Sequence, residues 1–296
     1  MSSFLHAHGH DVFIVSMPLK GVNKGPGSNA TYAQDDHWWF LPIERAGEPA
    51  LRYFLEPAIA TINYARRLGY EEVHMAGLSG GGWTTTVVAA LDARVASSFP
   101  IAGSIPCAMR DPEKQTWPVG NDKEDFEQKC APDPSIEAPD HPGRQLYREC
   151  NYTCMHLLAG LESTRYQVQI LHERDDCCYA TVGRHDQMLA YESNVRAELG
   201  ARAEHGYFTT TASNHTHHEV APVDKAIWTA GMRAAQLPPG DPGWDALQCD
   251  IMHNAEGACS VRPPTGGAPP PLRARAAGGS GGRSCGGAQA VAVTTN

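Results

Sequence analysis

Residues 71–86 read EEVHMAGLSGGGWTTT. An apolar run leads to glycines on both sides of a single serine, Ser79, and threonines and further apolar residues follow. The apolar run predicts a buried strand, and residues 83–93 predict a helix. A chain that passes from strand to helix within one or two residues strains the turn residue, and glycine neighbours leave room for that strain. We therefore predict a strand, a tight turn that exposes the hydroxyl of Ser79, and a helix.

Strand-like and helix-like segments alternate on both sides of this turn, which is typical of parallel strands joined by helices. The expected strands are 11–18, 71–77, 94–103, 166–173 and 205–212. The expected helices are 57–68, with Pro57 in its first turn, 83–93, 187–200 and 222–237. The sequence therefore predicts an α/β fold with a mostly parallel sheet flanked by helices.

Two segments depart from the alternating pattern. Residues 104–165 contain several cysteines and show little periodicity apart from a helix near 144–160, so we expect an ordered, cap-like insertion. From Val261 onward the chain is mostly Gly, Pro, Ala and Arg, which cannot bury enough apolar surface to offset chain entropy. We predict one domain over 1–240 and a low-complexity, disordered tail over 241–296.

Composition limits the partners and the location. The formal net charge is −9, and no basic and aromatic residues interleave, so we expect no nucleic acid partner. No apolar run approaches the roughly 18 to 20 residues that span a bilayer, so we expect no integral membrane segment. Nine cysteines and the glycosylation-type tripeptides at Asn29, Asn151 and Asn214 favour a secreted or lumenal protein, although MSSFLHAHGH has no signal-peptide pattern. The oligomeric state is not predicted.

The turn at Ser79 carries a family resemblance. Residues 77–81, Gly-Leu-Ser-Gly-Gly, fit G-x-S-x-G between a strand and a helix, and lack the G-x-G-x-x-G spacing of a nucleotide-binding turn. In this context the motif resembles the nucleophile elbow of the α/β-hydrolase family. The resemblance covers about residues 5–237, and implies that Ser79 is a nucleophile and that the backbone amide of Gly80 is an oxyanion donor.

The family's order of nucleophile, acid and histidine implies an acid after the strand 166–173. The segment QILHERDDCC offers Asp175 and Asp176 there. Counting from His172 selects Asp176, whereas aligning the cysteine pair with resembling hydrolases selects Asp175. We favour Asp175 and keep Asp176 as the alternative. Adjacent cysteines seldom bond to each other, so we expect Cys177 and Cys178 to have separate partners or to be buried thiols.

The same order implies a histidine between the last strand and the last helix. The segment SNHTHHEVAP offers His215, His217 and His218, and the residues after His218 resemble those after the family's histidine. We favour His218, with His215 and His217 as alternatives. The resemblance thus implies an esterase-like or lipase-like serine hydrolase with a catalytic triad, which acts on small or polymeric carboxylic esters without a cofactor or a metal.

The family's second oxyanion donor follows a strand that has no counterpart in this sequence, so the resemblance implies an N-terminally truncated domain. Two other functions stay open. A catalytically inactive scaffold of this family would serve as a secreted binding protein. A metal-dependent hydrolase is the third possibility, because the alternating His6, His8 and His10 with Asp11 resemble an H-x-H-x-D-H metal signature with its last two residues exchanged.

Overall fold

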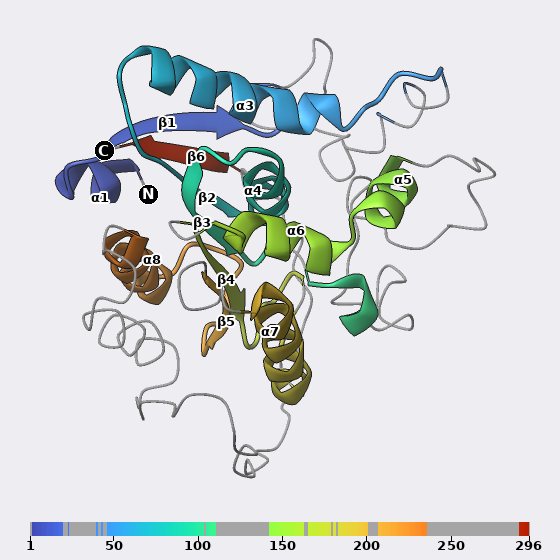
Figure 1. The fold of residues 1–296 in the computed structure, drawn as a ribbon. Coiled ribbons are helices and arrows are strands. Elements are labelled where there is room, and N and C mark those ends of the chain that lie inside the picture. Colours follow the sequence, from blue (N-terminus) through green and yellow to red (C-terminus); the bar gives the residue numbers. More distant parts are fainter. Residues whose placement is uncertain are drawn as a thin grey trace.

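The computed structural model describes residues 2–19, 23, 40, 43, 46–103, 105–110, 142–162, 165–178, 180–181, 183–200, 207–235 and 290–295. Within them, strands and helices alternate as the sequence predicts (Figure 1). The elements are α1 (Ser2–Ala7), β1 (Asp11–Ser16), α3 (Arg52–Arg67), β2 (Val73–Leu78), α4 (Gly80–Leu91), β3 (Val95–Ile101), the 3₁₀ helix η4 (Cys107–Met109), α5 (Pro142–Glu149), α6 (Tyr152–Gly160), β4 (Tyr166–His172), α7 (His185–Leu199), β5 (Tyr207–Ser213), α8 (Pro222–Ala235) and β6 (Ala290–Thr295).

The strands form one sheet in the order β1-β6-β2-β3-β4-β5. Strands β2 to β5 pair in parallel, while β6 is antiparallel to both of its neighbours. Strand β1 therefore runs in the same direction as β2 to β5, and the prediction of a mostly parallel sheet is confirmed. The carboxyl ends of β1 to β5 meet at one edge of the sheet, which we call the carboxyl edge.

Helices cover both faces of the sheet, so the molecule has three layers and belongs to the α/β class (Figure 1). Helices α3, α4, α6 and α7 lie on one face, and α1 and α8 lie on the other. Successive residues of β2 point to opposite faces. Met75 packs with the residues under α3 and α4, and Ala76 packs with Trp228 of α8.

Helix α3 begins earlier than its sequence predicts. It starts at Arg52, so Pro57 lies inside the helix and the expected place of Pro57 in the first turn is wrong. Phe54, Ala58 and Ile62 are all buried on one face of α3. The apolar spacing therefore continues on the N-terminal side of the proline, and burial of this face outweighs the hydrogen bond that proline removes.

The described part of the expected insertion contains two α-helices, α5 and α6, and the short 3₁₀ helix η4, where one helix was predicted. The side chain of Asn151 caps α6 by accepting a hydrogen bond from the amide of Cys154 at 3.0 Å, and Cys150 is bonded to Cys154. Helix α6 packs on α4, α7, β4 and β5, so it is the helical crossover between β3 and β4. The centre of the expected cap, residues 111–141, lies outside the described residues.

Strand β6 corrects the prediction of a disordered tail. Residues 290–295 lie between β1 and β2, where Val293 is opposite both Phe13 and Met75. The run AVAVTT combines strand-favouring residues with a position that offers backbone partners on both sides. The prediction is therefore wrong for these residues, and the other residues of 241–296 lie outside the described part of the chain.

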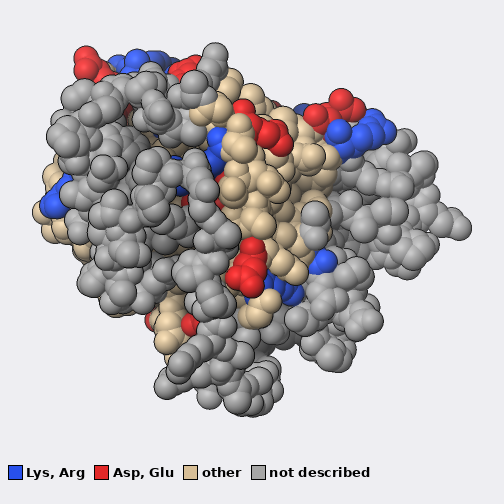
Figure 2. All heavy atoms as spheres, turned by 60° about the horizontal axis from the view of Figure 1, so that its bottom comes forward, with Lys and Arg blue, Asp and Glu red and all other residues tan. Residues whose placement is uncertain are grey.

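The described surface shows no broad area of one charge on the face in Figure 2. Acidic and basic side chains lie there in small separate groups among uncharged ones. In the part of the chain that the structure describes, none of the helices combines the length and the apolar character needed to cross a bilayer.

Candidate active site

Ser79 lies in the tight turn between β2 and α4. Its backbone has φ 59° and ψ −126°, so the predicted strain at this residue is confirmed. The amide of Ser79 donates to the carbonyl of Ile101 at 2.9 Å, and its carbonyl accepts from the amide of Trp83 at 3.0 Å. The turn is thus held by β3 on one side and by the first turn of α4 on the other.

Glycines let α4 start directly against the sheet. A Cβ atom on Gly77 would lie 2.2 Å from the carbonyl oxygen of Gly81, and one on Gly82 would lie 2.8 Å from the Cα of Gly103. The prediction that small residues prevent collisions around the serine is therefore confirmed. The amide of Gly80 belongs to the first turn of α4, where amides lack intrahelical partners and the helix dipole favours negative charge.

Backbone strain gathers at the carboxyl edge. The described non-glycine residues with positive φ are Leu19 at 60°, Ser79 at 59° and Ala102 at 43°. Each of them follows the carboxyl end of a strand, namely β1, β2 and β3. Strained backbone is enriched at functional sites. The carboxyl edge is therefore the part of the molecule in which to look for chemistry.

The register of the sheet places the predicted site residues at this edge. Four residues near the strand ends lie side by side: Leu78, Ile101, Ile170 and Thr211. Ser79 follows β2, Asp175 follows β4 and His218 follows β5, each within a few residues of this line. Strand β4 lies two positions from β2, about 10 Å away, and β5 lies three positions from β2, about 14 Å away, so the loops after β4 and β5 and their side chains have to bridge these distances.

Asp175 and His218 are in contact, and they are the acid and histidine that the sequence favours. Nδ1 of His218 lies 2.9 Å from Oδ2 and 3.1 Å from Oδ1 of Asp175. Oδ1 also accepts the amides of Cys177 at 2.8 Å and Cys178 at 2.9 Å. Burial, the largest influence, raises the pKa of Asp175, but its contacts with His172, His218 and the Cys178 amide hold the pKa well below its usual range. Asp175 is therefore an anion that can accept a hydrogen bond from the Nδ1–H group of His218.

The other ring nitrogen of His218 is buried. Nε2 is shielded from solvent and has no hydrogen-bond partner among the described residues, so Nε2 is not bonded to Ser79 in this conformation. Catalytic hydrogen bonds are often long before substrate binds and shorten afterwards. Nε2 is thus the position at which His218 can accept a proton.

The alternative residues form a second, more exposed group. Oδ2 of Asp176 lies 3.3 Å from Nδ1 of His217, and Oδ1 accepts the backbone amide of His218 at 3.1 Å. The side chain of His217 is 71% exposed. The ring of His215 packs edge-on against His172, with 4.9 Å between centroids. Of the candidate pairs, only Asp175 with His218 is a carboxylate and imidazole pair shielded from water in the described chain.

Sequence reasoning missed a second buried partner of Asp175. Nδ1 of His172 lies 3.7 Å from Oδ2 of Asp175, which is within ion-pair range but longer than a hydrogen bond. Nε2 of His172 lies 3.0 Å from Oδ2 of Asp224, in the first turn of α8. The same oxygen of Asp224 accepts the amide of Ala221 at 2.7 Å. The three side chains are fully buried.

The two carboxylates decide the charge of His172. Burial, the largest influence, lowers its pKa, but contact with Asp175 and Asp224 raises the pKa to about 9. The buried imidazole is therefore protonated at neutral pH. A histidine at the end of a buried strand and an acid in the first turn of the last helix were the available signals, but nothing local in the sequence connects them.

The cysteine pair next to Asp175 differs from its prediction. Cys177 and Cys178 are bonded to each other, so the expectation of separate partners is wrong. Their sulfur atoms and one ring nitrogen of His218 lie within 4.8 Å of one another, and this is the only metal-type ligand group within the described ranges. The bond between the sulfurs makes them poor ligands, because a metal binds the thiolate.

The histidines near the start of the chain do not gather. No three of His6, His8, His10 and Asp11 bring ligand atoms together as a metal requires, as far as the described residues show. Nδ1 of His8 lies 2.8 Å from the carbonyl oxygen of Phe4. The structure therefore gives no support to a metal site in this segment.

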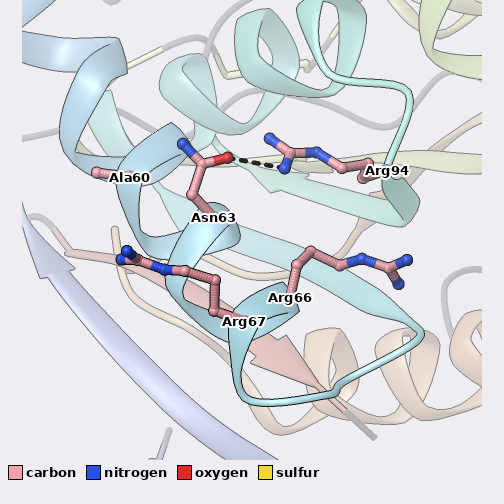
Figure 3. Close-up of a pocket in the computed structure, with 5 residues that line it drawn as sticks. All are labelled: Ala60, Asn63, Arg66, Arg67 and Arg94. Atoms are coloured by element: carbon pink, nitrogen blue, oxygen red, sulfur yellow. Dashed lines mark hydrogen bonds between the residues drawn. The ribbon is translucent and has the colours of Figure 1, made fainter.

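A pocket at the opposite edge of the sheet is basic (Figure 3). Its lining residues are Ala60, Asn63, Arg66, Arg67 and Arg94. Arg94 donates to Asn63 at 2.7 Å and to Asp92 at 2.6 Å, and Arg66 donates to the carbonyl of Tyr70 at 3.0 Å. Two of its arginines therefore already bond within the protein. The pocket lies at the amino ends of β2 and β3, so it is separate from the Ser79 turn at their carboxyl ends.

Comparison of the chain with protein-family models, with curated proteins and with solved structures finds no match. The functional conclusion therefore rests on the residues of the carboxyl edge.

Proposed function

We propose that this protein is a serine hydrolase of the α/β-hydrolase type that cleaves carboxylic esters with the triad Ser79, Asp175 and His218. The observation that carries the proposal is the buried contact between Asp175 and His218, at 2.9 Å, on the sheet edge that also holds the strained Ser79 turn. An ionised acid, an imidazole with one free nitrogen and a serine at a helix start are the groups that acyl transfer needs.

The first half of the reaction forms an acyl-enzyme. His218 Nε2 takes the proton of the Ser79 hydroxyl while Oγ attacks the ester carbonyl carbon. The carbonyl oxygen becomes an oxyanion, which the amide of Gly80 stabilises by about 2.7 to 4 kcal/mol. The bond to the alcohol oxygen then breaks, and Nε2 returns the proton to the leaving alcohol.

The second half releases the acid. Water gives a proton to His218 Nε2 and attacks the acyl carbon, and Ser79 leaves with that proton. Asp175 keeps Nδ1 protonated and stabilises the imidazolium that forms in each half. The mechanism needs no cofactor, and its substrate is a small or polymeric ester.

We also propose a secreted or lumenal location. The disulfides Cys150–Cys154 and Cys177–Cys178 support it, because disulfides persist mainly in oxidising compartments. The glycosylation-type residue Asn214 is exposed, as an acceptor must be. Mass mapping of the protein from secreting cells would show both the bridges and a glycan, whereas fully reduced, unmodified protein would contradict this location.

Hydrolysis of short-chain nitrophenyl esters tests the reaction. The full chain should release nitrophenol, and Ser79→Ala should reduce kcat by at least about 10³-fold while leaving the fold intact. A chelator should leave the rate unchanged if no metal takes part. Equal rates for the wild type and Ser79→Ala would exclude Ser79 as the nucleophile.

An inactive binding scaffold is the second candidate, and it is favoured by the absence of a hydrogen bond between His218 Nε2 and Ser79. A protein of this kind would fold and would keep the buried pair but hydrolyse no ester. Soaking with a transition-state-like phosphonate distinguishes the two, because an active site should shorten the contact between Nε2 and Oγ.

A further inference from the structure

We infer that His172 and Asp224 form a positioning pair for Asp175, in which a buried imidazolium between two carboxylates fixes the carboxylate that contacts His218. The pair was not among the residues that the sequence identified. Its effect on catalysis rests on the proposed function, whereas its charge and contacts do not.

The buried cluster of His172, Asp175 and Asp224 has to balance its charges. Asp175 and Asp224 are fully buried, and two buried carboxylates without a cation between them would be very unfavourable. Nε2 of His172 lies 3.0 Å from Asp224 and Nδ1 lies 3.7 Å from Asp175, within ion-pair range, so a carboxylate lies beside each ring nitrogen and favours the imidazolium. With His172 charged, the cluster retains one net negative charge, and this is the charge that an imidazolium at His218 would neutralise during the reaction.

Hydrogen bonds of Asp224 join the end of β4 to the segment that follows His218. Oδ2 of Asp224 accepts both from His172 and from the amide of Ala221, so it ties the end of β4 to the start of α8. The loops after β4 and β5 are also joined directly, because the amides of Glu173 and Asp176 donate to the carbonyls of Ser213 and Thr216 at 2.8 Å. The pair therefore braces both segments that carry Asp175 and His218.

The described groups that face the cluster come from three elements. Asp175 faces His172 from the loop after β4, Asp224 faces it from α8, and the ring of His215 faces it from the loop after β5. His215 itself lies 3.7 Å from Glu219. On the side of His218, Asp176 and His217 form a second pair that is partly or largely exposed.

The first experiment measures the charge of His172 in the full-length protein by NMR titration of its ring. The signal should change with a midpoint near pH 9 in the wild type. Asp224→Asn keeps an oxygen acceptor for Ala221 but removes the negative charge, and should lower the midpoint by at least about one pH unit. A wild-type midpoint at or below about pH 6.5, the ordinary value for histidine, or no change in the variant would overturn the pair.

The second experiment measures how pH affects the reaction of Ser79 with a fluorophosphonate, in which Oγ bonds to phosphorus and fluoride leaves. His172→Gln removes the cation beside Asp175, so His218 should hold its proton more tightly. The acidic limb of the plot of labelling rate against pH should therefore shift to higher pH by about one unit. His156→Gln is the matched control, because it also replaces a buried histidine. It should leave the limb where it is.

The outcomes are distinguishable. If no variant and no wild-type protein reacts at any pH, the proposed function fails, while the NMR titration still decides whether His172 is a charged bridge. If His172→Gln and His156→Gln slow the reaction equally and neither moves the acidic limb, His172 is a structural residue only and the positioning role is wrong. If His172→Gln does not fold, Asp224→Asn decides by the same titration.

Discussion

Two buried histidines in this protein differ in charge at neutral pH, because one is neutral and the other is positive. His156 of α6 stacks on Phe208 with 4.5 Å between ring centroids, and burial lowers its pKa to about 3. His172, at the carboxyl edge, is equally buried, but Asp175 and Asp224 raise its pKa to about 9. Burial alone therefore does not decide whether an imidazole is charged, because the adjacent groups can reverse its effect.

The comparison extends to the regions around these histidines. Around His156 the neighbours are aromatic rings and the hydroxyl of Tyr191, which lies 2.7 Å from Nδ1. Around His172 the neighbours are the carboxylates of Asp175 and Asp224 and the ring of His215. The first region stabilises the molecule by packing, whereas the second concentrates charge at the edge of the sheet where a reaction is proposed.

Substitutions in the two regions should differ most in their effect on kcat. Asp175→Asn leaves the shape of the site intact but favours the wrong tautomer of His218, and should reduce kcat for an ester by about 10⁴-fold. His156→Gln should change kcat by less than about threefold. The measurement is a steady-state assay on both variants. Comparable losses in the two variants would mean that the carboxyl edge has no special role.

The second test compares packing in the two regions. Gly77→Ala would place a Cβ atom 2.2 Å from the carbonyl oxygen of Gly81, and should reduce the free energy of unfolding by more than about 3 kcal/mol. Gly160→Ala in α6 would place a Cβ atom 3.3 Å from the carbonyl oxygen of Tyr207. In this variant the higher helix propensity of alanine, up to about 1 kcal/mol, should largely offset the cost of that close contact, so the free energy of unfolding should change little. Urea unfolding of both variants checks the difference, and equal losses would refute it.

The third test uses pH, because the two histidines should change stability in opposite directions. The folded pKa of His172 is raised to about 9, so its contribution of about 3 kcal/mol is complete below pH 6.5 and is lost as pH rises through 9. The folded pKa of His156 is lowered to about 3, so stability is lost as pH falls below 6.5, by about 3 kcal/mol near pH 4.5.

Urea unfolding across pH separates these contributions. His156→Gln should remove its part of the acidic loss, and Asp224→Asn should shrink the alkaline loss by lowering the pKa of His172. An alkaline loss of unchanged size in Asp224→Asn would show that His172 is not its source.

The smallest expected effect concerns the two disulfides. The amides of Cys177 and Cys178 donate to Asp175, so replacing both cysteines with serine should loosen this carboxylate and reduce kcat by about tenfold, or about 1.4 kcal/mol. Replacing Cys150 and Cys154 with serine, near His156, should leave kcat unchanged. The outcome that contradicts this account is an equal effect of the two replacements.

Much of the fold could be predicted because it depends on local patterns. Apolar runs and helical spacing identified the strands β1 to β5 and the helices between them, and the glycines around Ser79 identified the strained turn. The start of α3 was misplaced because Pro57 was given more weight than the apolar face that continues before it. Strand β6 was missed because the composition of the whole tail concealed the short run AVAVTT.

The candidate site residues could be predicted from the sequence only where the order of the strands along the chain locates them. The loops that hold Asp175 and His218 were identified by their place after successive strands, and the structure brings these two residues together. The contact between His172 and Asp224 joins residues 52 positions apart, and it depends on how α8 packs on β4. Local periodicity contains no information about such a contact, so the charge of His172 could not be predicted either.

Covalent labelling can show whether Ser79 is a nucleophile that His218 activates. The full-length protein should be incubated with a fluorophosphonate and digested, and the modified residue located by mass spectrometry. We predict one phosphonyl group per chain, on Ser79, and at least about 10³-fold slower labelling in His218→Gln. Absence of the group from Ser79, or labelling at the same rate in His218→Gln, would contradict the claim.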